Sequence, residues 1–561
     1  MKKFKYAIGI AAMAMFGACS SDAPEIIDNN PEEGSDAKMY LSLNITGSTG
    51  TRAQTTAQTE TSGVENTIKN LLIQIYDEAE NLVLCKKTTD FSDDKTVAYF
   101  EVDYNQYQNV KTLFNNTDND PNKNPRIIVV ANSKESYSLS TPVIHDDYTD
   151  PTWGIQTGDG INKIGNSPCF IMTNMAECHA IAAPATGHDG TDKEKSWKLT
   201  TTAIPIGRMA TRFEYGTDNK DSYTLESNSG MTMEIVGMKI ETFGVSTLYI
   251  PTFTADGKVP EDFSVANSHV HYSGKEAFPY RATAVKTSDE RAEYQSLDYS
   301  YLNSANKFTY AHPNTISKAY TLKKSVDDYK ALPNAAIKVK FNCTNFAGTG
   351  AVSESMKKGD NVYAVNGVFI GGVKDYIKLK KANKTFAISN SYADGSDEYT
   401  KVKAVVDLYN GLNYSLMPSQ KDGKTEGGTE DDAWFKKQFP NVDTYAPEYA
   451  EGESKATTAD GAHKYYTYYA KFITHFTDPS DVLVQDWMKD KSGNILPQWM
   501  YGVSRNTSYA LAVNSIRFMG ATGDKGVGDG PTASDISTLW IDLSITIKPW
   551  DVNVSNTAWD L

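Results

Sequence analysis

The amino-acid sequence predicts a mainly β fold, built of β-sandwiches with few short helices. The first observation is that short runs alternate apolar and polar residues, which is the pattern of a strand with one buried face. The second is that clusters of Gly, Asn, Asp, Ser and Pro separate these runs, as turns do. The third is the length of 561 residues, which exceeds what one hydrophobic core accommodates and indicates two or more domains.

The predicted strands are short and spread over most of the chain. They are residues 39–46, 68–77, 97–103, 126–132, 233–241, 335–342, 361–370, 465–474 and 541–547. Helical periodicity is restricted to 398–412 and 431–439. No repeat of about 20–50 residues recurs, so the sequence does not indicate a solenoid or a propeller.

The first and the last of these strands have matching patterns. One face of the first carries Met39, Leu41, Leu43 and Ile45, and one face of the last carries Ile541, Leu543, Ile545 and Ile547. Small or polar residues separate the aliphatic ones in both strands. Either strand could therefore fill the same apolar groove between two sheets, although unrelated strands can also look alike.

Residues 1–19 are predicted to be a lipoprotein signal peptide. Three lysines near the start precede an apolar run, Ala7 to Phe16, which is too short for a stable membrane anchor. The run ends in "MFGAC", which resembles a bacterial lipobox and makes Cys19 the predicted lipidation site. An ordinary signal peptide with a chance cysteine is the alternative. The acidic segment 20–37 that follows is typical of a flexible tether.

A Gly/Ser/Thr/Gln-rich segment, 47–63, follows the first strand, and such segments are preferred places of proteolytic nicking. It contains one basic residue, Arg52, so a trypsin-like protease would cut between Arg52 and Ala53. The cut would detach residues 19–52 with the lipid and the first strand, and would leave the groove empty. In an uncleaved chain we expect the groove to be filled and the last strand to be loosely held.

The search for catalytic, metal and cofactor sites gives no candidate, so we predict a protein that is not an enzyme and has no cofactor. His269 and His271 would share a strand face, but no further His or Cys lies near them in the sequence. The segment 118–129 begins like a calcium loop but lacks its Gly and final Glu, and the Gly-rich 523–530 lacks a βαβ context. The net charge of −15, with no basic stripe, argues against a nucleic-acid partner.

Four cysteines follow Cys19, namely Cys85, Cys169, Cys178 and Cys343. Disulfides are allowed in an exported protein, and a Cys169–Cys178 bridge is one interpretation. Buried free thiols are the other.

Several segments in order resemble the fimbrillins of type V pili in Bacteroidia, and the Mfa-type shaft subunit of the minor fimbrium in particular. They are "TGTRAQ", "RIIVVANS", "IPIGRMATRFEY", "YGVSRNTSYALAVNSIRFMG" and the closing "ITIKPWDV…WDL". The likeness extends over most of the chain, but 250–335 and 372–464 show no family motif.

The resemblance implies two transthyretin-like β-sandwich domains, export as a lipoprotein, removal of the first strand after an Arg, and polymerisation by donor-strand exchange. Carried over to this chain, it gives a signal peptide (1–19), a tether with the removable strand (20–52), an N-terminal domain (53–200), a C-terminal domain (201–536) and donor strands (537–561). The implied donor residues are Ile541, Leu543, Ile545, Ile547, Trp550 and Val552.

The implied partners are copies of the chain in a head-to-tail filament, anchor and tip pilins, an Arg-specific surface protease, and the outer membrane through the lipid. The precursor is then expected at the outer membrane and the product in a surface fimbrium that supports adhesion or biofilm formation. Two alternatives stay open: a surface glycan-binding lipoprotein of a polysaccharide-uptake system, and an anchor or tip subunit of the same pilus.

Overall fold

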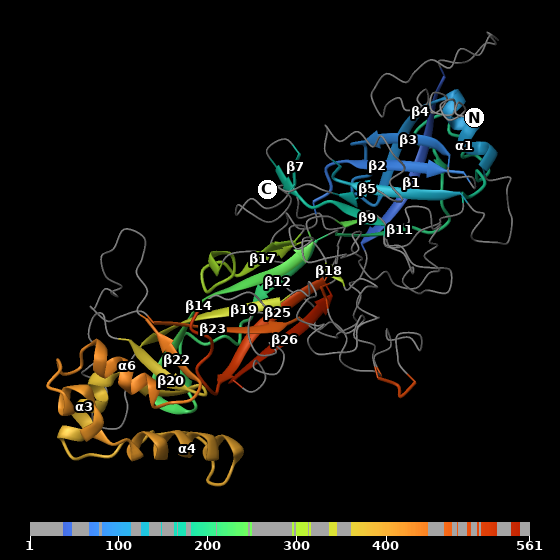
Figure 1. Ribbon diagram of the computed structural model, residues 1–561. Coiled ribbons are helices and arrows are strands. Elements are labelled where there is room, and N and C mark those ends of the chain that lie inside the picture. Colours follow the sequence, from blue (N-terminus) through green and yellow to red (C-terminus); the bar gives the residue numbers. More distant parts are fainter. Residues whose placement is uncertain are drawn as a thin grey trace, which may run out of the picture.

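A computed structural model gives the fold as two large β-sheets with a group of helices at one end (Figure 1). The structure describes residues 37–47, 67–77, 81–113, 125–133, 147–148, 162–164, 167–174, 181–208, 210–244, 247–248, 294–296, 299–311, 314–315, 336–344, 361–446, 465–473, 480, 491–494, 502–503, 507–523 and 540–549. The predicted class, mainly β with few short helices, is confirmed.

The first sheet contains the strands of the N-terminal part of the chain. These are β1 (Lys38–Gly47), β2 (Leu71–Tyr76), β3 (Leu82–Thr88), β4 (Val97–Asp103), β5 (Arg126–Ala131), β9 (Met172–Asn174), β10 (Trp197–Lys198) and β11 (Ile204–Arg208). Their order is β10-β1-β11-β9-β5-β2-β3, and β4 pairs with β1. Aliphatic side chains from β1, β2 and β5 fill the core of this sheet. Apolar burial alternates along β1, whereas β2 is buried along its whole length.

The second sheet contains strands from the rest of the chain. These are β12 (Thr211–Tyr215), β13 (Tyr223–Leu225), β14 (Asn228–Gly244), β16 (Tyr294–Ser296), β17 (Phe308–Ala311), β19 (Ala336–Thr344), β23 (Tyr465–Phe472), β25 (Thr507–Ile516) and β26 (Ile541–Pro549). The order is β17-β12-β25-β13-β14-β19-β23, with β16 on β14 and β26 on β25. The residues of the first core lie between Met39 and Ala210, and those of the second between Phe213 and Leu543. The domain limits inferred from the sequence stay a prediction.

Smaller strand pairs complete the described sheets. They are β6 (Asp147–Tyr148) with β15 (Thr247–Leu248), β7 (Asn162–Ile164) with β8 (Ser167–Cys169), β18 (Asn314–Thr315) with β24 (Gly502–Val503), and a three-stranded group of β20 (Val362–Val365), β21 (Val368–Gly371) and β22 (Val442–Tyr445).

The described helices are α1 (Tyr104–Leu113), α3 (Val373–Lys381), α4 (Asp397–Gly411), α5 (Pro418–Lys421) and α6 (Thr429–Lys437), with short 3-10 turns η4 (Tyr299–Tyr301) and η6 (Tyr414–Leu416). The two predicted helices correspond to α4 and α6. At the far end of the molecule α3, α4 and α6 pack on one another through aromatic rings, and the ring of Tyr376 lies 5.3 Å from those of Tyr409 and Phe435.

The prediction of a single strand over 361–370 is wrong. Asn366 and Gly367 have φ values of 49° and 79°, and they form the two-residue turn of a hairpin between β20 and β21. An Asn-Gly pair is the preferred sequence for such a turn because both residues tolerate positive φ. The turn reverses the chain in the middle of a continuous apolar run.

Two cysteines have described side chains. Cys343 is a fully buried free thiol, and burial raises its pKa. Cys85 is disulfide-bonded, so the free-thiol interpretation is wrong for it. The side chains of Cys169 and Cys178 lie outside the described residues, as do His269, His271 and most of the 118–129 and 523–530 loops.

We predict that Gly367→Ala, in the turn between β20 and β21, lowers the free energy of unfolding by about 1–3 kcal/mol. The residue has positive φ, and an added Cβ would lie 2.8 Å from the Phe518 Cβ. Gly411→Ala is the matched control, because no atom lies within 4 Å of its added Cβ and its φ is not positive. Denaturant unfolding of both variants checks this, and equal midpoints would contradict it.

Candidate functional site

The strand β1 is hydrogen-bonded to other strands along both of its edges. On one edge it runs antiparallel to β4, with Lys38 opposite Asp103 and Asn44 opposite Val97. On the other edge it pairs in parallel first with β10 and then with β11, where Ile45 lies opposite Ile204. The N-terminal strand is therefore an interior strand, although it comes first in the described chain.

The apolar face of β1 lies in the first core. Met39, Leu41, Leu43 and Ile45 are 7%, 0%, 0% and 1% exposed. Burial of four such side chains is worth about 6–12 kcal/mol before the cost of ordering the strand. The structure thus places the four predicted residues of the removable strand together in one groove. Their removal by cleavage stays a prediction.

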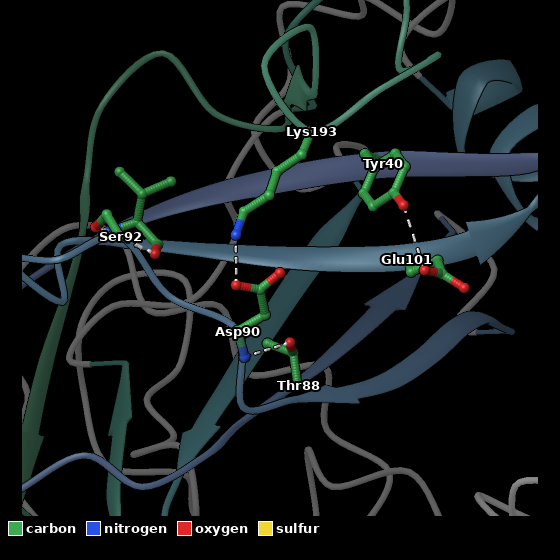
Figure 2. Close-up of polar contacts among 7 residues, drawn as sticks. Tyr40, Thr88, Asp90, Ser92, Glu101 and Lys193 are labelled. Carbon is green, nitrogen blue, oxygen red and sulfur yellow. Dashed lines mark hydrogen bonds and ion pairs between the residues drawn. The ribbon is translucent and has the colours of Figure 1, made fainter.

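Two sets of polar contacts lie on the opposite face of β1 and along its β10 edge, and Figure 2 shows the Tyr40–Glu101 and Lys193–Asp90 contacts among them. Near the start of β1, Glu101 of β4 accepts a hydrogen bond from the Tyr40 hydroxyl at 3.3 Å (Figure 2). It accepts another from the Lys38 ammonium at 2.7 Å. The hydrogen bond from Lys38 holds the pKa of Glu101 below its ordinary value, and it raises the pKa of Lys38. Both side chains are largely solvent-exposed, so the pair orients β1 more than it stabilises it.

The second set comes from the segment 190–199, which contains β10 and which we call the strap. The Tyr40 N–H donates to the Gly190 carbonyl at 2.8 Å, and the Leu199 N–H donates to the Ser42 carbonyl at 2.9 Å. Between these two attachments Lys193 reaches over the strands to Asp90, with Nζ 2.6 Å from the carboxylate. The hydrogen bond to Asp90 raises the pKa of Lys193. The strap therefore connects the edge of β1 with the far side of β4.

The strap is anchored in the core by Trp197, whose indole N–H donates to the Ala182 carbonyl at 2.8 Å. Its ring contacts Tyr107 of α1 at a centroid distance of 5.3 Å. Gly190 has φ of 81°, and an added Cβ would lie 2.6 Å from the Tyr107 ring and 3.1 Å from the Tyr40 carbonyl oxygen. A side chain at this position would force the strap away from β1.

The expectation that the last strand is loosely held is wrong. β26 pairs antiparallel with β25 from Ile541 opposite Ile516 to Pro549 opposite Thr507. Ile541 and Leu543 are buried in the second core, whereas Ile545 is half-buried and Thr546 is exposed. The strand is held because its aliphatic face has an apolar site on its own domain. Among the described strands β26 pairs only with β25, so it is an edge strand.

The remaining predicted residues are not placed. Cys19, Arg52, Ala53, Trp550 and Val552 lie outside the described residues, and Ile547 lies in β26 without a described side chain. Within the described part of the chain, β1 and β26 lie in different sheets and do not pair with each other.

The sequence reasoning missed the strap and α1. The strap has no regular alternation, so no periodic signal could reveal it. For α1 a signal existed: Asp103 and Gln106 form a capping box, in which the Gln106 N–H donates to the Asp103 carboxylate at 2.7 Å and the Asp103 N–H donates to the Gln106 side chain at 3.3 Å.

No group of His, Cys, Asp or Glu side chains suited to holding a metal ion occurs among the residues that the structure describes. In the same part of the chain no helix has the length and apolar character needed to cross a membrane.

The fold and the groove define a protein of two β-sheets, the first of which is completed by an N-terminal strand. Two family models match it. Residues 39–207 match the major fimbrial subunit protein FimA, and residues 464–556 match the C-terminal region of fimbrillin, the type IV major fimbrial subunit protein. The resemblance to fimbrillins is thereby confirmed in the parts of the chain that hold β1 and β26.

No curated protein matches the chain. Among solved structures, a putative cell adhesion protein from Parabacteroides distasonis is 10% identical, with 92% of this chain and 97% of that chain covered and a TM-score of 0.38. A fimbrilin from Porphyromonas gingivalis W83 is 10% identical, with 92% and 98% covered and a TM-score of 0.35. The C-terminally truncated tip fimbrial protein Mfa3 of P. gingivalis is 10% identical, with 91% and 100% covered and a TM-score of 0.31. With TM-scores this low, these structures do not locate functional residues in this chain.

We predict that Leu41→Ala lowers the free energy of unfolding of the uncleaved chain by about 2–5 kcal/mol, because it leaves a cavity in the first core. Thr46→Ala, on the same strand but exposed, should change it by less than about 0.5 kcal/mol. Denaturant unfolding monitored by fluorescence is the measurement. Similar effects of the two substitutions would show that β1 is not seated in the core.

Proposed function

We propose that this protein is the shaft subunit of a cell-surface fimbrium. In this proposal it is exported as a lipoprotein through Cys19, cut after Arg52, and polymerised when the C-terminal strand of one subunit replaces β1 in the next. The observation that carries the proposal is that β1, the strand immediately before the cleavable segment, fills an interior position with four buried aliphatic residues.

The family matches support a role in a fimbrium at the cell surface. The FimA match begins at Met39, the first buried residue of β1, and the fimbrillin C-terminal match includes the whole of β26. Both families consist of fimbrial subunits rather than enzymes, in line with the prediction that the chain does not catalyse a reaction.

The driving force of the exchange follows from a comparison of the two places that β26 can occupy. On its own domain β26 pairs along one edge, and two of its described aliphatic residues are fully buried. In the place of β1 it would pair along both edges and offer four aliphatic residues to a groove that buries all four positions. Main-chain hydrogen bonds would give the affinity and the alternate side chains the fit.

Cleavage is needed because a tethered strand outcompetes a free one. Before the cut β1 belongs to the same chain as its groove, so its effective concentration is high and a neighbour's strand cannot displace it. After the cut the segment 19–52 is an ordinary ligand that can dissociate. Each joint leaves one donor strand and one groove unused at opposite ends, and the product is therefore an open filament with copies of this chain as partners.

The alternatives from the sequence differ from the shaft subunit at one end of the chain or the other. A glycan-binding uptake lipoprotein or an anchor subunit would keep Cys19 and β1, and a tip subunit would need no donor strand. N-terminal sequencing of sheared surface material separates a processed pilin from a lipoprotein that stays intact: Ala53 at the N-terminus supports the pilin, and a blocked Cys19 supports the intact lipoprotein. The substitutions in the C-terminal strand described below test for the donor strand that a tip subunit would not need.

We predict that Arg52→Ala abolishes polymer formation, because β1 then stays tethered in the groove. Purified precursor is treated with trypsin, and SDS-resistant multimers are counted by gel electrophoresis. Arg52→Lys is the matched control, since trypsin also cuts after Lys and multimers should form. Multimers of normal length from Arg52→Ala, with residues 19–52 retained, would refute the proposal.

We predict that Ile545→Asp abolishes polymerisation while the subunit stays folded. Ile545 is half-buried on its own domain, whereas the position that it would take in the groove, that of Leu41 or Leu43, is fully buried. A carboxylate is therefore tolerated on β25 but excluded from the groove. Thr546→Asp, which changes an exposed residue, is the control and should polymerise. Undiminished polymers from Ile545→Asp would rule out β26 as the donor. This substitution is a more specific test than deletion of 537–561, because the deletion would also remove Ile541 and Leu543 from the second core.

A further inference from the structure

We propose that Ser544 is a specificity-determining residue of the donor strand, because it takes the place of Ser42 beneath the strap and that place admits only a small side chain. The inference rests on the strand exchange proposed above. It concerns the outward face of the groove, whereas the exchange itself depends on the apolar face.

Ser42 is in the middle of β1 on the side that points away from the core. Tyr40 and Asn44 on the same side are half-buried, but Ser42 is only 5% exposed. Its cross-strand neighbours are Tyr99 on β4 and Lys198 on β10. A small polar residue is thus covered at the position where an outward-facing strand residue would ordinarily meet solvent.

The contact between Ser42 and Tyr99 is of the closer kind found in antiparallel sheets. The Tyr99 N–H donates to the Asp90 carbonyl, and the Ser42 carbonyl accepts from the Leu199 N–H, so these groups point away from each other. They therefore form a non-hydrogen-bonded pair, in which Cα atoms are about 4.5 Å apart and side chains meet.

The Lys193 side chain lies over the Tyr99 ring. Its Nζ is 4.6 Å from the centre of this ring and 2.6 Å from the Asp90 carboxylate. Lys193 belongs to the strap, which is attached at one end by the Tyr40–Gly190 hydrogen bond and at the other by the buried Trp197. A large side chain in the place of Ser42 would have to displace the Tyr99 ring and the Lys193 side chain over it.

The donor strand has a small residue at the corresponding point. Ser42 is the centre of the series Met39, Leu41, Leu43, Ile45, and Ser544 is the centre of the series Ile541, Leu543, Ile545, Ile547. Because Ser544 is central, it takes the place of Ser42 whichever direction the donor strand runs. Thr546 would take the place of Tyr40 or of Asn44, where a larger residue already fits.

On its own domain Ser544 is half-buried, and its hydroxyl donates to the Ala512 carbonyl at 3.2 Å. The site on β25 is therefore more open at this residue than the groove is. The groove, not the resting position, sets the stricter limit on size. Strands with a bulky residue between the second and third aliphatic positions are excluded from the groove, which selects partners of matching pattern.

The experiment compares Ser544→Tyr with Thr546→Tyr in the full-length chain. Precursors are cleaved with trypsin, and the rate of SDS-resistant multimer formation is measured. We expect Ser544→Tyr to assemble about tenfold more slowly or worse, as overpacking predicts, and Thr546→Tyr to assemble at the wild-type rate. Thermal unfolding of the uncleaved precursors shows whether either substitution disturbs the subunit itself.

A second variant tests the strap directly. Cleaved Ser544→Tyr chains are mixed with cleaved chains carrying Tyr99→Ala, which opens the space above Ser42, and mixed joints should form faster than with wild-type acceptors. Equal assembly of Ser544→Tyr and wild type, or no gain from Tyr99→Ala, overturns the inference and leaves the strand exchange standing. Failure of the cleaved wild-type chain to form multimers instead overturns the proposed function, and this inference with it.

Discussion

The first sheet depends on the seating of β1 between β4 on one side and β10 and β11 on the other. Among the described strands, β4 and β10 are connected to the rest of the sheet only through β1. Withdrawal of β1 would open the core and also deprive two further strands of their partner, leaving their backbone groups unpaired. A chain without β1 is therefore stabilised by any strand that pairs with both β4 and the β10–β11 edge. The dependence on one interior strand is what would make an exchange favourable.

The two sheets contain strands that follow one another closely in the chain. β11, which borders the groove in the first sheet, ends at Arg208, and β12, which pairs with β25 in the second sheet, begins at Thr211. In the second sheet the buried Arg212 guanidinium binds Glu214 and Ser508 of β25. These contacts hold β12 to β25, the strand on which β26 lies. β11 borders the groove, and the next strand of the chain, β12, therefore belongs to the sheet that holds β26.

The alternation of apolar and polar residues predicted many of the longer strands. Where it failed, the reason lies in how the residues are packed. Alternation located β1 and β4 because apolar residues recur at every second position of each strand and lie in the core. It could not resolve 361–370, where both faces are buried and only Asn366-Gly367 marks the turn. It could not reveal the strap, which is held by single hydrogen bonds and Lys193 rather than by a repeated pattern. The four aliphatic residues of β1 were evident in the sequence, but the cover over Ser42 depends on residues about 50 and 150 positions away.

In the proposed exchange, two features would limit premature polymerisation: the covalent connection of β1 to its groove before cleavage, and the pairing of β26 with β25 in its own domain. A donor strand that lay free would expose a flat aliphatic edge, which promotes uncontrolled association. On β25, Ile541 and Leu543 are buried, so these two aliphatic side chains of β26 are not exposed. In the proposed exchange, β26 would leave β25 for the groove of a neighbour, which offers pairing on two edges instead of one. Assembly would then start only when an empty groove is present, and not whenever subunits meet, because of this difference between the two sites.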